Sequence, residues 1–129
     1  MDKIVPFIPY GKQNITDEDI QAVVDVLKSD LLTQGPKIQE FERAFADYVG
    51  AKYAVAVNNA TAGLHLSSKA LGVKINDRVI VTPITFAASA NCIRYCGGNV
   101  VFCDIDKHSY LLDTGLLREK LNSCPPNTY

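Results

Sequence analysis

The stretch VNNATAGLHLSSKALG (57–72) contains the residues best suited to bind an anion. Asn58, Asn59 and the Ala-Thr-Ala-Gly run (60–63) join a strand-like run to a helix-like run. The first turn of a helix offers free backbone N–H groups and a partial positive charge, and small side chains let an oxyanion approach them. The pattern therefore predicts either a phosphate site with the Thr61 hydroxyl as an extra donor, or an ordinary helix cap made by Asn59 or Thr61. It matches neither GxxxxGK[ST] nor GxGxxG, so a P-loop or a standard dinucleotide site is not indicated.

Two further segments follow predicted strands and bring other chemistry to the same place. In an open parallel sheet, ligands bind beyond the carboxyl ends of the strands. TPITFAASAN (82–91) places Phe86 there, where its ring either stacks on a flat heteroaromatic ring or fills the core. FCDID (102–106) places Asp104 and Asp106 there. Paired carboxylates suit acid–base or metal chemistry, although Asp also favours turns by bonding its own backbone.

Apolar periodicity and capping residues predict the elements that position these segments. Thr16 and Asp113 are suited to begin the first and last helices, while Pro36 and Gly50 are suited to begin and end the second. The alternation of strand and helix from residue 52 onward is typical of right-handed crossovers in a parallel sheet. Helices are expected over 16–30, 36–50, about 61–72, 85–96 and 113–121, and strands over 52–57, 78–83 and 99–104.

The predicted fold class is therefore α/β, with a mostly parallel sheet and helices on both faces. Residues 1–50 are expected to form an N-terminal helical segment, and residues 51–129 the first βα units of an incomplete domain. The segment NSCPPNTY (122–129) is expected to be a loop. Three parallel strands would leave a long unpaired edge, which proteins normally cover. The pattern thus suggests the N-terminal part of a larger α/β domain.

Composition excludes several classes of protein. The chain has 129 residues, of which 47% are hydrophobic, enough for one globular core. Its formal net charge is -1, which argues against nucleic acid or an anionic membrane as the main partner. The N-terminus lacks the apolar core of a signal peptide, and no run reaches the ~18 apolar residues of a membrane helix. The expected compartment is the cytoplasm.

The four cysteines are expected to be buried or unpaired thiols rather than metal ligands. Neither His65 nor His108 stands at a zinc-type spacing from them, and a free cysteine behaves as a small hydrophobe. The cysteines are Cys92, Cys96, Cys103 and Cys124.

Three segments taken together resemble the nucleotide-sugar aminotransferases of the DegT/StrS type. They are LTQGPKIQEFERAFADYVGAKYAVAVNNATAGLHL (32–66), TPITFAASAN (82–91) and GGNVVFCDID (97–106). The resemblance, which covers about residues 9–121, implies the fold-type-I architecture of enzymes that use pyridoxal 5'-phosphate (PLP), with this chain as the N-terminal part of the large domain. PYGKQNIT followed by LLTQG looks most like the pseudaminic acid subgroup. That subgroup aminates a UDP-linked 4-keto-6-deoxy-N-acetylhexosamine with glutamate as the amino donor.

The resemblance also implies roles for individual residues. Thr61 and Ala62 match the segment that holds the phosphate of PLP, and Phe86 matches the aromatic residue that stacks on the pyridine ring. Tyr10 matches a position that contacts the sugar substrate, and the LLTQG loop (31–35) lies near the active site or the dimer contact in this family. The implied full-length enzyme is a homodimer that takes a UDP-sugar and glutamate, with no nucleic-acid or membrane partner.

Transamination also needs a lysine that binds the cofactor covalently and an acid that keeps the pyridinium nitrogen protonated. In the family both lie further along than this chain reaches. Lys69 stands eight residues along the predicted helix from Thr61, or about 12 Å at ~1.5 Å per residue, and would point away from a ring at the helix start. The other lysines stand in polar surroundings. No catalytic residue is therefore expected here, and the isolated chain is expected to be inactive.

Two other functions stay open at this point. A non-catalytic module that binds a sugar nucleotide, or that assembles with a partner chain, would keep the anion site at the helix start and need no lysine. A small metal-dependent enzyme would instead use Asp104 and Asp106.

Overall fold

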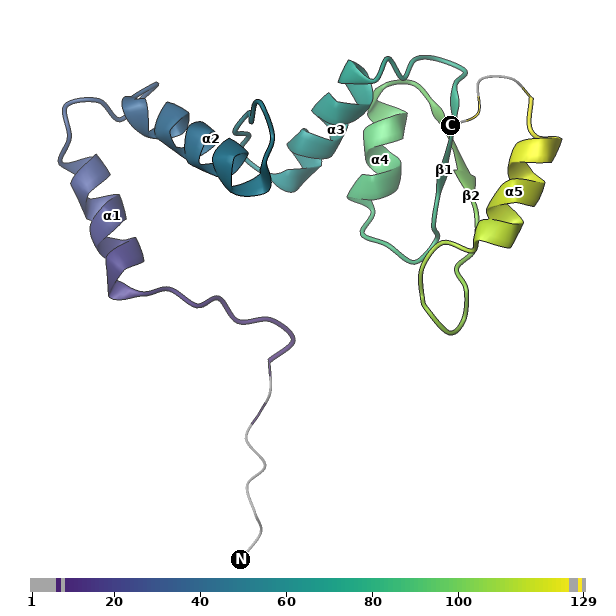
Figure 1. Cartoon of the computed structure of the whole chain (residues 1–129), viewed down its shortest axis with the longest axis horizontal. Helices are drawn as coiled ribbons and strands as arrows, with labels where there is room; N and C mark the ends of the chain where they lie inside the picture. The colour runs from purple at the N-terminus through teal and green to yellow at the C-terminus, as the bar shows by residue number, and fades with distance from the viewer. Residues whose placement is uncertain (1–6, 8, 126–127, 129) are drawn as a thin grey trace, which may run out of the picture. The chain divides into compact units, whose positions relative to one another are not determined.

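The computed structural model of the chain describes residue 7, residues 9–125 and residue 128. The chain forms two compact units, Met1–Ala56 and Val57–Tyr129 (Figure 1). Each unit has its own secondary structure and is described by itself. The predicted division at residue 50 stays a prediction.

The described part of the first unit contains two helices, most of whose ends were predicted from the sequence. α1 (Asp17–Leu27) begins with a capping box, because the Thr16 hydroxyl accepts a hydrogen bond from the Asp19 N–H (3.3 Å) and the Asp19 carboxylate accepts one from the Thr16 N–H (2.8 Å). α2 (Pro36–Val49) has Pro36 at its first position and ends at Gly50, whose φ of 68° is left-handed. The predicted capping roles of Thr16, Pro36 and Gly50 are confirmed, although α1 ends before residue 30.

The segment predicted as a strand over residues 52–57 is not a strand in the structure. A strand needs a neighbouring strand to complete its backbone hydrogen bonds, and no described residue provides one here. The Ala56 N–H donates instead to the Glu42 carboxylate at 2.8 Å. Tyr53 and Val55 are 77% and 78% exposed, so the apolar run that predicted a buried strand is not buried within the described chain. This prediction is wrong for the described chain.

The second unit alternates helices and strands as predicted. β1 and β2 pair in parallel, with Arg78 opposite Asn99 and Val81 opposite Phe102, and α4 makes the crossover between them. α4 starts later than predicted because the Ser89 N–H donates to the Phe86 carbonyl, so a tighter i to i+3 turn precedes the helix. The elements in chain order are α3 (Ala60–Ala70), β1 (Arg78–Val81), α4 (Ala88–Tyr95), β2 (Asn99–Phe102) and α5 (Thr114–Ser123).

The core of the second unit is made by α4 and the residues that follow β2. Ala88, Cys92 and Ile93 on α4 are buried, and Cys103 is fully buried just beyond β2. All four cysteines are free thiols, as predicted. The buried carboxylate of Asp77 accepts a hydrogen bond from the Lys74 N–H at 3.0 Å, which fixes the turn that leads into β1.

The sheet has two strands over the described residues rather than the three predicted. Thr128, in the segment predicted as a loop, makes an isolated parallel bridge to Arg78. Arg78 therefore has a neighbour on each side, Asn99 in β2 and Thr128. Across the described ranges, every helix is too short or too polar to cross a bilayer.

Candidate functional site

α3 begins at Ala60, one residue before the predicted start, with Asn59 as its cap. The Asn59 side-chain oxygen accepts a hydrogen bond from the Ala62 N–H at 2.8 Å, and its backbone oxygen accepts one from the Gly63 N–H at 3.2 Å. No described residue accepts a hydrogen bond from the N–H of Ala60 or of Thr61. Because the first N–H groups of a helix have no partner within it, these two donors are free to bind a ligand.

The side chains around these donors are small and uncharged. Thr61 is half-buried, and within the described part of the chain its hydroxyl has no hydrogen-bond partner. Gly63 lies beside Val57, and an added Cβ would make an ordinary van der Waals contact with Val57 Cγ2 at 3.5 Å. The first turn of α3 carries no acidic residue. Two N–H groups and a hydroxyl at the positive end of a helix are the donor set that a phosphate requires, so this helix start fits the phosphate of a cofactor.

The start of α3 lies toward the end of the second unit at which the strands end. In Figure 1, α3 and α4 both run against the direction of β1, so both begin on the side toward which β1 runs. The two helices pack together, and His65 on α3 meets Tyr95 on α4 edge to face with their ring centroids 5.3 Å apart. This is the side of the sheet on which the sequence predicted a ligand.

Phe86 lies between β1 and α4, at the same end of the unit. Its side chain is 77% exposed, so it does not fill the core of the described chain. The hydroxyls of Thr85 and Ser89 lie 3.0 Å apart and tie the turn that carries Phe86 to the first residues of α4. The ring is therefore accessible within the described chain, and its role in stacking on a ligand stays a prediction.

Asp104 and Asp106 act as turn residues after β2. The Asp104 carboxylate accepts a hydrogen bond from the Ile105 N–H at 2.8 Å. The Asp106 carboxylate accepts bonds from the Ser109 N–H at 2.8 Å and the His108 N–H at 3.1 Å. Hydrogen bonding from Ser109, chiefly from its backbone amide, holds the pKa of Asp106 below its usual 3.8. The turn interpretation of this pair is thus supported, and no cluster of three metal-ligating side chains occurs among the residues that the structure describes.

Tyr10 and the lysines were the remaining candidates from the sequence. Tyr10 belongs to the first unit and is exposed. Every described lysine is exposed except Lys120, which is half-buried. A lysine that reacts with a carbonyl group is usually activated by burial or by a neighbouring cation. The described part of the chain contains no fully buried lysine.

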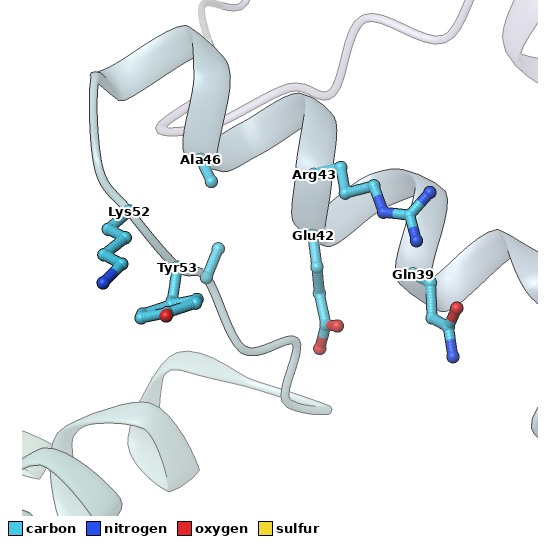
Figure 2. Close-up of a pocket in the computed structure, with 7 residues that line it drawn as sticks. Gln39, Glu42, Arg43, Ala46, Lys52 and Tyr53 are labelled. Atoms are coloured by element: carbon cyan, nitrogen blue, oxygen red, sulfur yellow. The ribbon is translucent and has the colours of Figure 1, made fainter.

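The first unit has a polar cleft of about 200 Å³ that no sequence motif indicated. Figure 2 shows Glu42 and Arg43 on α2 and Lys52 and Tyr53 on the segment that follows it. The Lys52 ammonium lies 5.1 Å from the centroid of the Tyr53 ring. The Glu42 carboxylate accepts a hydrogen bond from the Ala56 N–H, and this bond holds the segment after α2 against the helix.

Comparison with known proteins gives one consistent result. Residues 13–124 match the DegT/DnrJ/EryC1/StrS aminotransferase family. The chain is 48% identical over 107 residues to the spore coat polysaccharide biosynthesis protein SpsC of Bacillus subtilis, a match that covers 83% of this chain and 28% of SpsC. It is 47% identical over 98 residues to the UDP-4-amino-4,6-dideoxy-N-acetyl-beta-L-altrosamine transaminase of Campylobacter jejuni, covering 76% of this chain and 26% of that enzyme. The chain therefore spans under a third of the length of these relatives.

Solved structures agree with the sequence relatives. Spr1654 from Streptococcus pneumoniae, described as a sugar aminotransferase, superposes with a TM-score of 0.85 and 36% identity, over 94% of this chain and 30% of its own. It has been solved in PLP and in pyridoxamine phosphate (PMP) forms. The expectations of a fold-type-I α/β architecture and of pyridoxal phosphate as the cofactor are confirmed. The chain belongs to the DegT/DnrJ/EryC1/StrS aminotransferase family.

Proposed function

We propose that the protein carrying this chain is a PLP-dependent aminotransferase that passes the amino group of glutamate to a UDP-linked 4-keto-6-deoxy sugar. The observation that carries the proposal is the start of α3, where the N–H groups of Ala60 and Thr61 and the Thr61 hydroxyl have no partner within the described chain and the first turn carries no acidic residue. The family match and the PLP and PMP forms of Spr1654 supply the identity of the anion.

The residues of this chain would bind and orient the cofactor. Ala60 and Thr61 donate hydrogen bonds to the phosphate, and Ala62 lines the site with a methyl group that leaves room for the phosphate oxygens. Phe86 offers an exposed ring for the flat face of the pyridine. Tyr10 is assigned to the sugar on the resemblance described above.

When bound, the cofactor would supply the chemistry by which an amino group passes from the donor to the acceptor. The positive end of α3 favours its phosphate, since the helix dipole and the unpaired amides act on the same group. A phosphate fixed at one point and a ring held against Phe86 would limit the cofactor to one orientation, which is how a site of this kind favours one reaction geometry. The covalent lysine and the acid that the family requires are assigned to residues outside this chain.

The choice of substrate rests on two relatives. One is named a UDP-4-amino-4,6-dideoxy-N-acetyl-beta-L-altrosamine transaminase and the other a spore coat polysaccharide biosynthesis protein. Both names connect this sequence with sugars, and the first connects it with a UDP-linked amino sugar. On the expectations set out above, the enzyme works as a homodimer in the cytoplasm and belongs to the pseudaminic acid subgroup.

The proposal is tested by incubating the purified protein with PLP, glutamate and a UDP-4-keto-6-deoxy-N-acetylhexosamine, and by following the sugar nucleotide by mass spectrometry. The keto oxygen should be replaced by an amino group only when both glutamate and PLP are present. Binding of the sugar nucleotide without any amination, in protein that binds PLP, would favour the non-catalytic module instead. The 129-residue chain treated with PLP and borohydride should show no single lysine labelled in preference to the others.

A further inference from the structure

We propose that Asn59 is a positioning residue for the cofactor. Its neutral carboxamide accepts a hydrogen bond from the Ala62 N–H, and this cap orients the Ala60 and Thr61 N–H groups toward the phosphate. The inference rests on the proposed function, because it concerns the same helix start. It assigns a role to a residue that the sequence motif indicated only as an alternative explanation for the helix cap.

The first step is an account of the donors at the start of α3. Asn59 has an extended backbone, with φ -165° and ψ 165°, and from there it accepts two hydrogen bonds. Its side-chain oxygen accepts a hydrogen bond from the Ala62 N–H at 2.8 Å, and its backbone oxygen accepts one from the Gly63 N–H at 3.2 Å. The bound donors are thus the deeper ones in the helix, and the free ones, on Ala60 and Thr61, are nearest the end.

The second step concerns order in the unbound protein. An N-cap fixes the first turn of a helix before any ligand binds. Donors that are already oriented spare the ligand the conformational entropy of ordering them. The Asn59 cap therefore raises the affinity for a phosphate without touching it, through the geometry of Ala60 and Thr61.

The third step concerns charge. Asparagine and aspartate are about equally good N-caps, so an Asn59→Asp protein should keep α3 intact. The added carboxylate would stand next to the phosphate, however, and like charges repel. Two unit charges about 6 Å apart, at an effective dielectric constant between about 20 and about 40, lower an affinity by about 10- to 100-fold.

The experiment measures the dissociation constants of PMP and of pyridoxamine, which lacks the phosphate, for the purified protein and its variants. Both probes lack the aldehyde that reacts with surface lysines. Asn59→Asp should weaken PMP by about 10- to 100-fold, leave pyridoxamine within about twofold, and leave the thermal unfolding temperature unchanged. The loss of PMP affinity in Asn59→Asp should be smaller at high salt, because salt screens the repulsion between the two charges. Asp113→Asn is the matched control: Asp113 caps α5 through the Gly115 and Leu116 N–H groups, and the change should leave PMP affinity unchanged.

Asn59→Ala provides a second variant that adds no charge. Loss of the cap should lower the unfolding temperature and weaken PMP relative to pyridoxamine by about 2- to 30-fold, the equivalent of a lost N-cap. If the Asn59→Asp protein does not fold, the loss of PMP affinity relative to pyridoxamine affinity in Asn59→Ala alone tests the inference.

Unchanged PMP affinity in Asn59→Asp would overturn the inference, as would an equal loss of PMP and pyridoxamine. Equal or tighter PMP binding by Asn59→Ala would overturn it too, because Asn59 would then merely compete with the phosphate. If the unmodified protein binds neither probe, the proposed function itself fails.

Discussion

Replacing Thr61 with valine removes one donor from the proposed phosphate site while keeping the shape of the side chain. The Thr61 hydroxyl has no hydrogen-bond partner within the described chain, and valine and threonine have similar helix propensities. The free energy of unfolding should therefore change by less than about 0.5 kcal/mol. A loss of cofactor binding could then not be explained by damage to the fold.

The expected loss of affinity follows from the donor set. The proposed phosphate site has two backbone N–H groups, on Ala60 and Thr61, and one hydroxyl, none of which has a partner within the described chain. A hydrogen bond to a charged group contributes about 1.5–3 kcal/mol, and each 1.4 kcal/mol is about a factor of ten in affinity. Thr61→Val should therefore raise the dissociation constant of PMP by about 10- to 150-fold.

Isothermal titration of PMP into the purified protein measures this change directly. Thr114→Val is the matched control, because Thr114 is an exposed threonine in the first turn of another helix, α5, and should not affect PMP. If Thr61→Val and Thr114→Val bind PMP equally well, the hydroxyl does not contact the phosphate. A phosphate at the start of α3 would then be bound by backbone N–H groups alone.

Three further outcomes are expected. Phe86→Leu should weaken PMP and pyridoxamine alike, by about 2- to 12-fold for the loss of a stacking ring, because the ring and not the phosphate is affected; titration with both probes checks this, and a loss confined to PMP would contradict it. Gly35→Ala should lower the free energy of unfolding by about 1–3 kcal/mol, since its Cβ would lie 2.5 Å from the Leu31 carbonyl oxygen, whereas Gly11→Ala, with open space around it, should not; equal thermal unfolding of the two would refute the steric reasoning. Because the folded pKa of Asp106 is lowered, its hydrogen bonds stabilise the turn above pH 3.8 and are lost as the pH falls through the lowered value; the Ser109 amide resonance, followed by NMR, should titrate below 3.8 and not above it.

The sequence predicted the helix ends well because each depends on a local interaction. Thr16 and Asp113 cap their helices through hydrogen bonds to residues within one turn, and Gly50 ends α2 by a left-handed backbone. Such interactions need only a few neighbouring residues, so a short motif suffices to identify them.

The strand predicted over residues 52–57 failed for the opposite reason. A strand is completed by a distant partner, and the apolar run KYAVAV (52–57) does not indicate where that partner lies. The bridge between Arg78 and Thr128, which lies in a segment predicted as a loop, was missed for the same reason.

At the candidate site, the sequence offered an anion site or an ordinary helix cap, and neither interpretation specified the donor atoms. The small residues of 60–63 indicated an anion at a helix start. Asn59, one of the two cap candidates from the sequence, is the cap; it accepts the Ala62 N–H, and the Ala60 N–H has no partner within the described chain. The exposure of Phe86 was equally beyond the sequence, because a core ring and a ligand-facing ring look alike in a list of residues.

The most direct test of this account is a crystal structure of the protein that carries this chain with PMP bound. The phosphate oxygens should lie within hydrogen-bonding distance of the Ala60 and Thr61 backbone nitrogens and the Thr61 hydroxyl, with the pyridine ring against Phe86. A bound PMP whose phosphate contacts other residues, with those amides facing solvent, would contradict it.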